Sequence, residues 1–171
     1  MPRAENNRHA LGANRSGFGP GATPAAPPSP CDSQYHYRLS HRKHAMPPLA
    51  RLFLAAGGLT ALAAVALGAF GAHALKGRVS PEMLAAWHTG VEYHVYHSLG
   101  LLAIGLVAIQ LPDSALLKGS GWTMFAGILL FSGSLYALAL SGERWLGAIT
   151  PVGGAAFLAA WALFAAAVLR A

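Results

Sequence analysis

The chain has 171 residues, of which 54% are hydrophobic and only 11% are charged, and its formal net charge is +6. A soluble domain ordinarily carries about 25% charged residues, and a soluble chain of this length could not hide so much apolar surface from water. The composition therefore excludes an ordinary soluble protein and indicates a membrane protein. The single cysteine, Cys31, also excludes an intrachain disulfide bond.

Residues 1–45 form a basic, proline-rich segment that differs from the rest of the chain. It holds six Arg and Lys residues against two acidic ones, and it lacks the apolar period of a helix or a strand. Such a segment is predicted to be a disordered tail. Three interpretations compete: a targeting peptide, a tail lying on anionic lipid headgroups, or a stretch that precedes a translation start at Met46, which we favour. No aromatic residues accompany the basic ones in a stripe, so nucleic-acid binding is not indicated.

Four apolar stretches follow in residues 46–171, the predicted membrane domain: about 49–72, 91–111, 121–140 and 146–169. Each is close to the ~20 apolar residues that cross a bilayer as a helix. Their short connections favour antiparallel neighbours. We therefore predict an all-α membrane fold, an antiparallel four-helix transmembrane bundle. The alternative for the first stretch, a signal peptide cleaved near Ala72–Ala74, is disfavoured because the apolar region is longer than the usual ~7–15 residues.

The second stretch has a helix start well before it. Ser80 is a good N-cap and Pro81 suits the first helical position. A helix from there to Leu111 would be about 46 Å long, which exceeds the hydrocarbon core. We therefore expect a short interfacial helix that bends near Thr89–Gly90. Tryptophans at the ends of spans are typical of the aromatic belt at headgroup level, and the candidates are Trp87, Trp122 and Trp145.

Polar residues gather at the start of the second stretch, where ionisable groups at membrane depth are candidates for a functional site. Antiparallel threading brings residues of the other stretches to the same half of the bundle. The predicted polar cluster consists of His73, His88, Glu92, Tyr93, His94, Tyr96, His97, Ser132, Ser134, Tyr136 and Thr150.

Helical periodicity divides this cluster into two groups. At 100° per residue, His88, Glu92 and Tyr96 share one face, while Tyr93, His94 and His97 form a second group. One helix therefore cannot bind a metal ion with all three of its histidines. His94 and His97 could share an ion if His73 supplied a third ligand, so these three are weak metal candidates.

Two other roles compete with metal binding at this cluster. Histidines in such positions commonly bond to hydroxyls or backbone carbonyls of neighbouring helices, which is a structural role. Alternatively, Glu92 and a histidine could exchange protons along a proton or solute path. No nucleophile–base arrangement, phosphate loop or cofactor motif occurs, so no enzyme activity and no cofactor are predicted.

Four motifs in residues 46–171 resemble the YgdD-like family of small four-span membrane proteins, domain of unknown function 423. They are residues 68–75 (GAFGAHAL), 87–100 (WHTGVEYHVYHSLG), 131–136 (FSGSLY) and 147–154 (GAITPVGG). The resemblance implies a compact multipass protein of the bacterial cytoplasmic membrane, with a mitochondrial membrane as the alternative. It supplies no activity, because the role of the family is unknown.

Two functional hypotheses follow. In the first, the protein is a structural or assembly partner in the lipid bilayer, whose polar cluster holds helices together or binds another membrane protein. In the second, it is a small oligomeric carrier or channel for protons or metal ions. Small residues recur on all four stretches, and they favour tight helix packing or a homo-oligomer interface.

Overall fold

The computed structural model describes residues 45–171, and most of the predicted tail, with Cys31, lies outside that range. Four long helices follow one another: α2 (Pro48–Phe70), α3 (Pro81–Gln110), α4 (Ala115–Ser141) and α5 (Thr150–Leu169). A short π-helix, η1 (Gly71–Leu75), extends α2, and a 3₁₀ helix, η2 (Arg144–Ala148), precedes α5. Within the described range there is no strand, and all four helical segments are long and apolar enough to cross a membrane. The predicted all-α four-helix membrane fold is confirmed.

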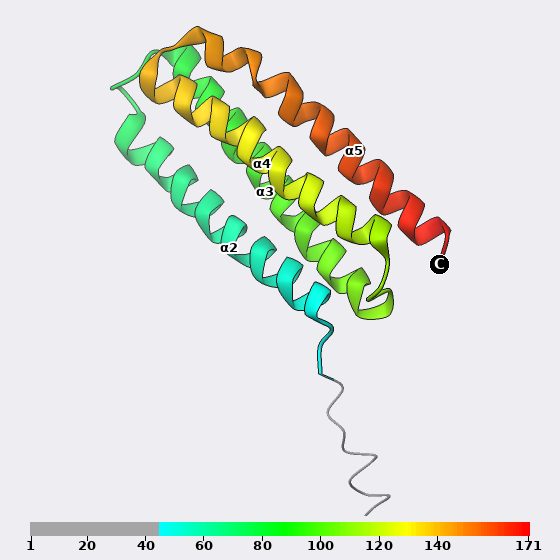
Figure 1. Cartoon of the computed structure of the whole chain (residues 1–171). Coiled ribbons are helices and arrows are strands. Elements are labelled where there is room, and N and C mark those ends of the chain that lie inside the picture. The colour runs from blue at the N-terminus through cyan, green and yellow to red at the C-terminus, as the bar shows by residue number, and fades with distance from the viewer. Residues whose placement is uncertain (1–44) are drawn as a thin grey trace, which may run out of the picture. The chain divides into compact units, whose positions relative to one another are not determined.

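Consecutive helices run antiparallel, with α3 and α4 in the centre and α2 and α5 on either side of them (Figure 1). Packing is extensive between α2 and α3, between α3 and α4, and between α4 and α5, but not between α2 and α5. In the most apolar part of each span, 44% of α3 residues and 39% of α4 residues are buried, against 17% for α2 and 22% for the last span. The outer helices therefore present most of their surface outward, where lipid covers it in a membrane.

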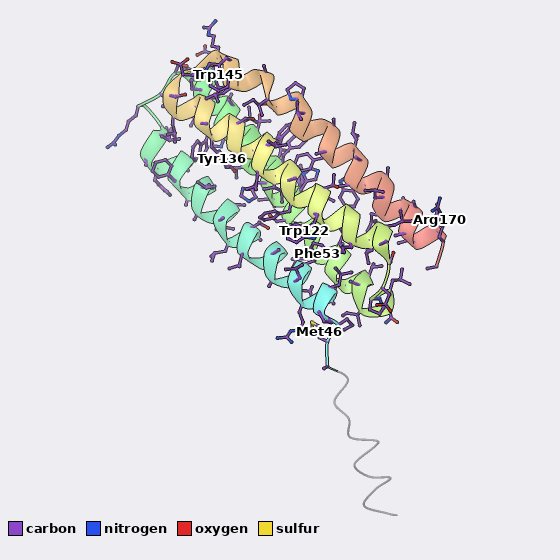
Figure 2. All side chains as sticks on the ribbon, in the orientation of Figure 1. Met46, Phe53, Trp122, Tyr136, Trp145 and Arg170 are labelled. Carbon is purple, nitrogen blue, oxygen red and sulfur yellow. The ribbon has the colours of Figure 1, made fainter. Side chains whose placement is uncertain are left out.

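Small residues allow the helices to approach closely, as expected for packing without a hydrophobic driving force. Gly105 of α3 is an example, because a Cβ atom there would lie 2.8 Å from the backbone nitrogen of Leu54 in α2. Large side chains fill the centre of the bundle, and the fully buried ones include Phe53, Leu101, Ile104, Leu117 and Met124. Met46 and Arg170 mark one end of the bundle, and Trp145 marks the other (Figure 2).

The start of α3 is as predicted, but its course is not. Ser80 caps the helix, its Oγ accepting a hydrogen bond from the backbone nitrogen of Met83 at 3.3 Å, and Pro81 is the first helical residue. The helix spans 30 residues in all, or about 45 Å, without a break at Thr89–Gly90, so the prediction of a separate interfacial helix was wrong. Gly90 is buried inside the continuous helix, against α4.

Trp87 holds the first turns of α3 against α2. Its side chain is 1% exposed, and its Nε1–H donates to the carbonyl oxygen of Leu67 in α2 at 3.0 Å. The ring is therefore a helix-packing group between α2 and α3, and it does not face lipid as a member of the aromatic belt would. Trp122 and Trp145 are 49% and 64% exposed, as an aromatic belt requires.

The last span also begins differently from the prediction. Residues 144–148 form η2, and α5 begins at Thr150 rather than near Leu146. Pro151 occupies the first turn of α5, where its missing N–H costs no helical hydrogen bond. This proline therefore starts a helix and does not kink one.

Candidate functional site

The polar residues predicted to converge come from η1, α3, α4 and the start of α5. Because the helices alternate in direction, the first half of α3 lies beside the second half of α4 and the start of α5 (Figure 1). Tyr136 is accordingly found in the half of the bundle that also holds Trp145 (Figure 2). His73, in η1, is exposed. The remaining residues do not form one cluster, because α3 directs its polar side chains to three different sides.

The first side of α3 faces outward. His88, Glu92 and Tyr96 are all exposed there, which matches the group that helical periodicity assigned to one face. The Tyr96 hydroxyl donates to Oε1 of Glu92 at 2.7 Å. Within the described residues this is the one hydrogen bond to the Glu92 carboxyl group.

The second side of α3 faces α4. His94 is 7% exposed, and its Nδ1 lies 3.2 Å from the hydroxyl oxygen of Tyr136. The absence of a side chain at Gly90 makes this approach possible, because a Cβ atom there would lie 2.9 Å from Cε1 of Tyr136. The other ring nitrogen of His94, Nε2, is buried without a hydrogen-bond partner in the described part of the chain.

The third side of α3 faces α5. The His97 ring is stacked on the Phe157 ring, with centroids 3.4 Å apart and an angle of 11° between the planes. The Nδ1–H of His97 donates to the backbone carbonyl oxygen of Tyr93 at 2.7 Å, which fixes the ring on its own helix. The Tyr93 ring in turn stacks on Phe131 of α4 at 4.5 Å. This side of α3 is thus an aromatic packing surface.

The hydroxyl residues of α4 belong to the contact with α5. The hydroxyl oxygens of Ser134 and Thr150 lie 2.9 Å apart, and Ser134 Oγ also lies 2.9 Å from the carbonyl oxygen of Phe131. The Oγ of Ser132 is buried and has no hydrogen-bond partner among residues 45–171. None of these hydroxyls contacts a histidine through a hydrogen bond given by the structure.

The weak metal candidates are not brought together. Over residues 45–171, no group of three His, Cys, Asp or Glu side chains is placed to hold a metal ion. His73 is exposed at the end of the bundle, His94 faces Tyr136, and His97 faces Phe157. The arrangement supplies separate hydrogen-bonded and stacked pairs between helices, and it supplies one polar pair that faces away from the bundle.

Glu92 is exceptional among the charged residues. Every other Asp, Glu, Lys and Arg in residues 45–171 lies in a connection or within four residues of a helix end. Glu92 lies eleven residues into α3, about 17 Å along the helix axis from Pro81. In a hydrocarbon core about 30 Å thick, centred on the bundle, its carboxyl group is inside the apolar layer.

Phe157 is a site residue that the sequence analysis missed. It lies in an apolar stretch with no polar neighbour, so no pattern marks it as the partner of His97. An indirect signal exists in the glycines around it: a Cβ atom on Gly127 would lie 2.6 Å from Cδ1 of Phe157, so α4 leaves room for this ring.

Comparison with known proteins finds similar membrane proteins whose function is unknown. A family model described as "Protein of unknown function (DUF423)" matches residues 67–154. The UPF0382 membrane protein YwdK of Bacillus subtilis is 48% identical over 120 residues, which cover 70% of this chain and 98% of that protein. A UPF0382 membrane protein of Staphylococcus epidermidis is 45% identical over 120 residues, covering 70% of this chain and 97% of that protein. No solved structure matches significantly.

Proposed function

The chain belongs to the DUF423 family of membrane proteins, and from that premise we propose that it is an assembly partner in the bacterial cytoplasmic membrane, which binds another membrane protein through the outward face of α3. This face, the Glu92 stripe, is defined by His88, Glu92, Tyr96, Leu99 and Leu106, all of which are exposed. The observation that carries the proposal is the outward-facing Glu92 carboxyl group within a membrane-spanning helix.

Lipid cannot supply hydrogen bonds to the carboxyl group of Glu92. A polar group left unpaired in hydrocarbon costs several kcal/mol. Tyr96 occupies Oε1 of Glu92, and the second oxygen, Oε2, has no partner in the described part of the chain. A neighbouring transmembrane helix with a hydrogen-bond donor at the same depth would satisfy that oxygen. Leu99 and Leu106 extend the stripe with apolar surface on which such a helix could pack.

A different protein suits this face better than a second copy of the chain. A two-fold homodimer centred on the Glu92 stripe would place Glu92 opposite Glu92. Two carboxylates at close range in a medium of low dielectric constant repel each other. A partner that carries Lys, Arg, His or a hydroxyl group at this depth avoids the repulsion and supplies the missing donor.

No specific observation favours the carrier or channel for protons or metal ions. A proton path needs Glu92 and a histidine along one route. The Glu92 carboxyl group is bonded to Tyr96 on the outer face, whereas His94 and His97 are buried on other sides of α3. Transport of protons or metal ions is therefore the alternative that the experiment has to distinguish from partner binding.

The test is site-specific photo-cross-linking of the full chain in its native membrane. A photoreactive residue at Leu99 lies on the Glu92 stripe, and the same residue at Leu158, 76% exposed on α5, is the matched control. We expect one discrete protein adduct from position 99 and none from position 158. Glu92→Leu should abolish the adduct, and Glu92→Gln should retain it in part because the amide can still form hydrogen bonds.

Three outcomes would overturn the proposal. Lipid adducts alone at both positions would show that no protein covers the stripe. An adduct between two copies of the chain would replace the different partner with a homo-oligomer. Proton or metal flux through liposomes containing purified wild-type chain, abolished by Glu92→Gln in a folded protein, would establish the carrier instead.

A further inference from the structure

A cavity of about 600 Å³ lies at the end of the bundle where α2 begins and where α3 is connected to α4. Residues of the first turns of α2 line one side of it, and residues 112–115 and Lys118 line the other. Met46 marks this end of the bundle, opposite the end that holds Trp145 (Figure 2). The wall of the cavity carries both charged and apolar side chains.

The cavity lies at the level of the lipid headgroups. Helix α4 is 27 residues long, or about 40 Å, whereas the hydrocarbon core is about 30 Å thick. With the bundle centred in the bilayer, the first turn of α4 therefore lies in the headgroup layer. On the α2 side of the cavity, Leu49 is partly buried and Leu52, further into the membrane, is 43% exposed. The cavity thus joins a charged wall at headgroup depth to apolar surface that faces lipid.

The start of α4 carries a cation where a helix favours an anion. Lys118 is the fourth residue of α4, and no acidic residue lies in the first turn of that helix. Ser114 accepts hydrogen bonds from the backbone N–H groups of Leu117, at 3.2 Å, and of Lys118, at 3.0 Å. The N–H groups of Ala115 and Leu116 have no acceptor within the helix. A phosphate group at this end of the cavity would be stabilised by Lys118 and by the positive end of the α4 dipole.

An acidic side chain lines the same cavity. Asp113 lies in the connection between α3 and α4 and is exposed, as Lys118 is. Within residues 45–171 the structure gives no ion pair between these two side chains and no hydrogen bond to the Asp113 carboxylate. Two opposite charges therefore line one cavity without being in contact with each other. A ligand that carries both an anion and a cation is complementary to this wall.

The chemistry of the two charges selects one class of lipid. In phosphatidylethanolamine, a phosphate and a primary ammonium group are joined by two carbon atoms, and the ammonium group can donate three hydrogen bonds to a carboxylate, as a lysine does. The quaternary ammonium group of phosphatidylcholine has no N–H donor. Phosphatidylglycerol has no cation at all, so its negative charge would meet Asp113 without compensation.

We propose that this cavity binds one phosphatidylethanolamine molecule, whose phosphate group contacts Lys118 and the start of α4 and whose ammonium group donates to Asp113. The acyl chains of this lipid lie along Leu52 and the outward surface of α2. The lipid thereby bridges the start of α2 and the connection between α3 and α4. The site shares no residue with the Glu92 stripe, so the two proposals stand or fall independently.

The test is native mass spectrometry of the full chain, purified in detergent and freed of lipid. The chain is titrated with palmitoyl-oleoyl phosphatidylethanolamine, phosphatidylcholine and phosphatidylglycerol, which share the same acyl chains. We expect phosphatidylethanolamine to bind about fivefold more tightly than the other two lipids, which corresponds to the ~1 kcal/mol of a good exposed ion pair. Glycerophosphoethanolamine, the same headgroup without acyl chains, should bind far more weakly because it loses the apolar contacts.

Two variants and two controls locate the site. Asp113→Asn removes the negative charge at nearly constant size, so it should bind phosphatidylethanolamine and phosphatidylcholine equally. Lys118→Gln should weaken the binding of phosphatidylethanolamine about fivefold. Glu143→Gln and Lys76→Gln change the same charges in the connections at the other end of the bundle, and both should leave lipid binding unchanged. All four side chains are exposed, so the variants should fold.

Contrary results are equally clear. Equal affinities of the wild-type chain for phosphatidylethanolamine and phosphatidylcholine would exclude recognition of the ammonium group. Tightest binding of phosphatidylglycerol would show a basic surface without the proposed role of Asp113. A preference that persists in both Asp113→Asn and Lys118→Gln would place the lipid elsewhere, and equal losses in the two controls would show a general effect of charge. Glycerophosphoethanolamine that binds as tightly as the intact lipid would replace the lipid with a soluble ligand.

Discussion

The indole nitrogen of Trp87 and the carbonyl oxygen of Leu67 lie 3.0 Å apart, and this hydrogen bond joins α3 to α2 just before α2 becomes a π-helix. The backbone N–H of Gly71 also donates to the same carbonyl, so one oxygen accepts two hydrogen bonds. Gly71 makes room for the indole, because a Cβ atom there would lie 2.5 Å from Cδ1 of Trp87. The buried Trp87 side chain therefore anchors the end of α2, next to the connection between α2 and α3.

Replacing Trp87 by Phe should destabilise the protein. The substitution removes the hydrogen bond to Leu67 and leaves part of the indole volume empty, and we expect a loss of about 1–3 kcal/mol in the free energy of unfolding. Trp122→Phe is the matched control, because Trp122 is 49% exposed, and it should change stability by less than about 0.5 kcal/mol. Unfolding in mixed detergent micelles measures both values. Equal losses would contradict the buried, hydrogen-bonded role of Trp87.

Gly90→Ala should separate α3 from α4 where Tyr136 meets His94. The new Cβ atom would lie 2.9 Å from Cε1 of Tyr136 and 3.3 Å from Cβ of Leu135, so a ring or a backbone has to move. Overpacking of this kind costs about 1–3 kcal/mol. Gly58→Ala places the same methyl group in open space and should be neutral or slightly stabilising. Unfolding measurements on the two variants distinguish close packing from a general effect of losing a glycine.

The sequence was sufficient for the spans, their antiparallel order and the Ser80 cap, because bilayer thickness and backbone hydrogen bonding leave few alternatives to apolar helices. It was insufficient for the burial of Trp87 between α2 and α3. A tryptophan near the end of a span suits the headgroup layer unless a neighbouring helix leaves space for it. Here that space comes from Gly71, sixteen residues earlier, and it depends on how α2 and α3 are aligned.

In the candidate site, too, the sequence predicts what depends on one helix alone and does not predict what depends on packing between helices. Periodicity along α3 separated Glu92 and Tyr96 from His94 and His97, since that separation depends on one helix alone. It could not separate His94 from His97, because that depends on where α4 and α5 pack against α3. Those helices place Tyr136 beside one histidine and Phe157 beside the other. The rotation of each helix about its axis follows from side-chain packing, which spacing within one helix does not encode.

His97→Phe should be tolerated, and His97→Ala should not. The stack on Phe157 is a contact between α3 and α5, whereas the Nδ1–H bond to Tyr93 lies within one helix. Phenylalanine preserves the stack, so we expect a change below about 1 kcal/mol, while alanine leaves a cavity and should cost about 2–3 kcal/mol. Loss of stability in both variants to the same extent would contradict this assignment. Flux assays on folded His97→Phe would also expose any role of the imidazole as a proton carrier, because phenylalanine cannot exchange protons.

Two buried serines on α4 should respond in opposite ways to the same substitution. Ser120 Oγ donates to the carbonyl oxygen of Ala160 in α5 at 2.8 Å, and both residues are completely buried. Ser120→Ala removes a hydrogen bond between helices, and such bonds contribute about 0.6–2 kcal/mol in membrane proteins. Ser132 is equally buried, but its Oγ has no partner among residues 45–171.

Ser132→Ala should therefore leave the free energy of unfolding unchanged or raise it by up to about 1 kcal/mol, because it removes a buried hydroxyl group that forms no hydrogen bond. The two variants are closely matched, since each deletes one oxygen atom from a fully buried side chain of the same helix. The difference between their unfolding free energies isolates the hydrogen bond from the common loss of one oxygen atom. If Ser132→Ala destabilises the chain as much as Ser120→Ala does, the Ser132 hydroxyl is bonded in the membrane to a group beyond residues 45–171.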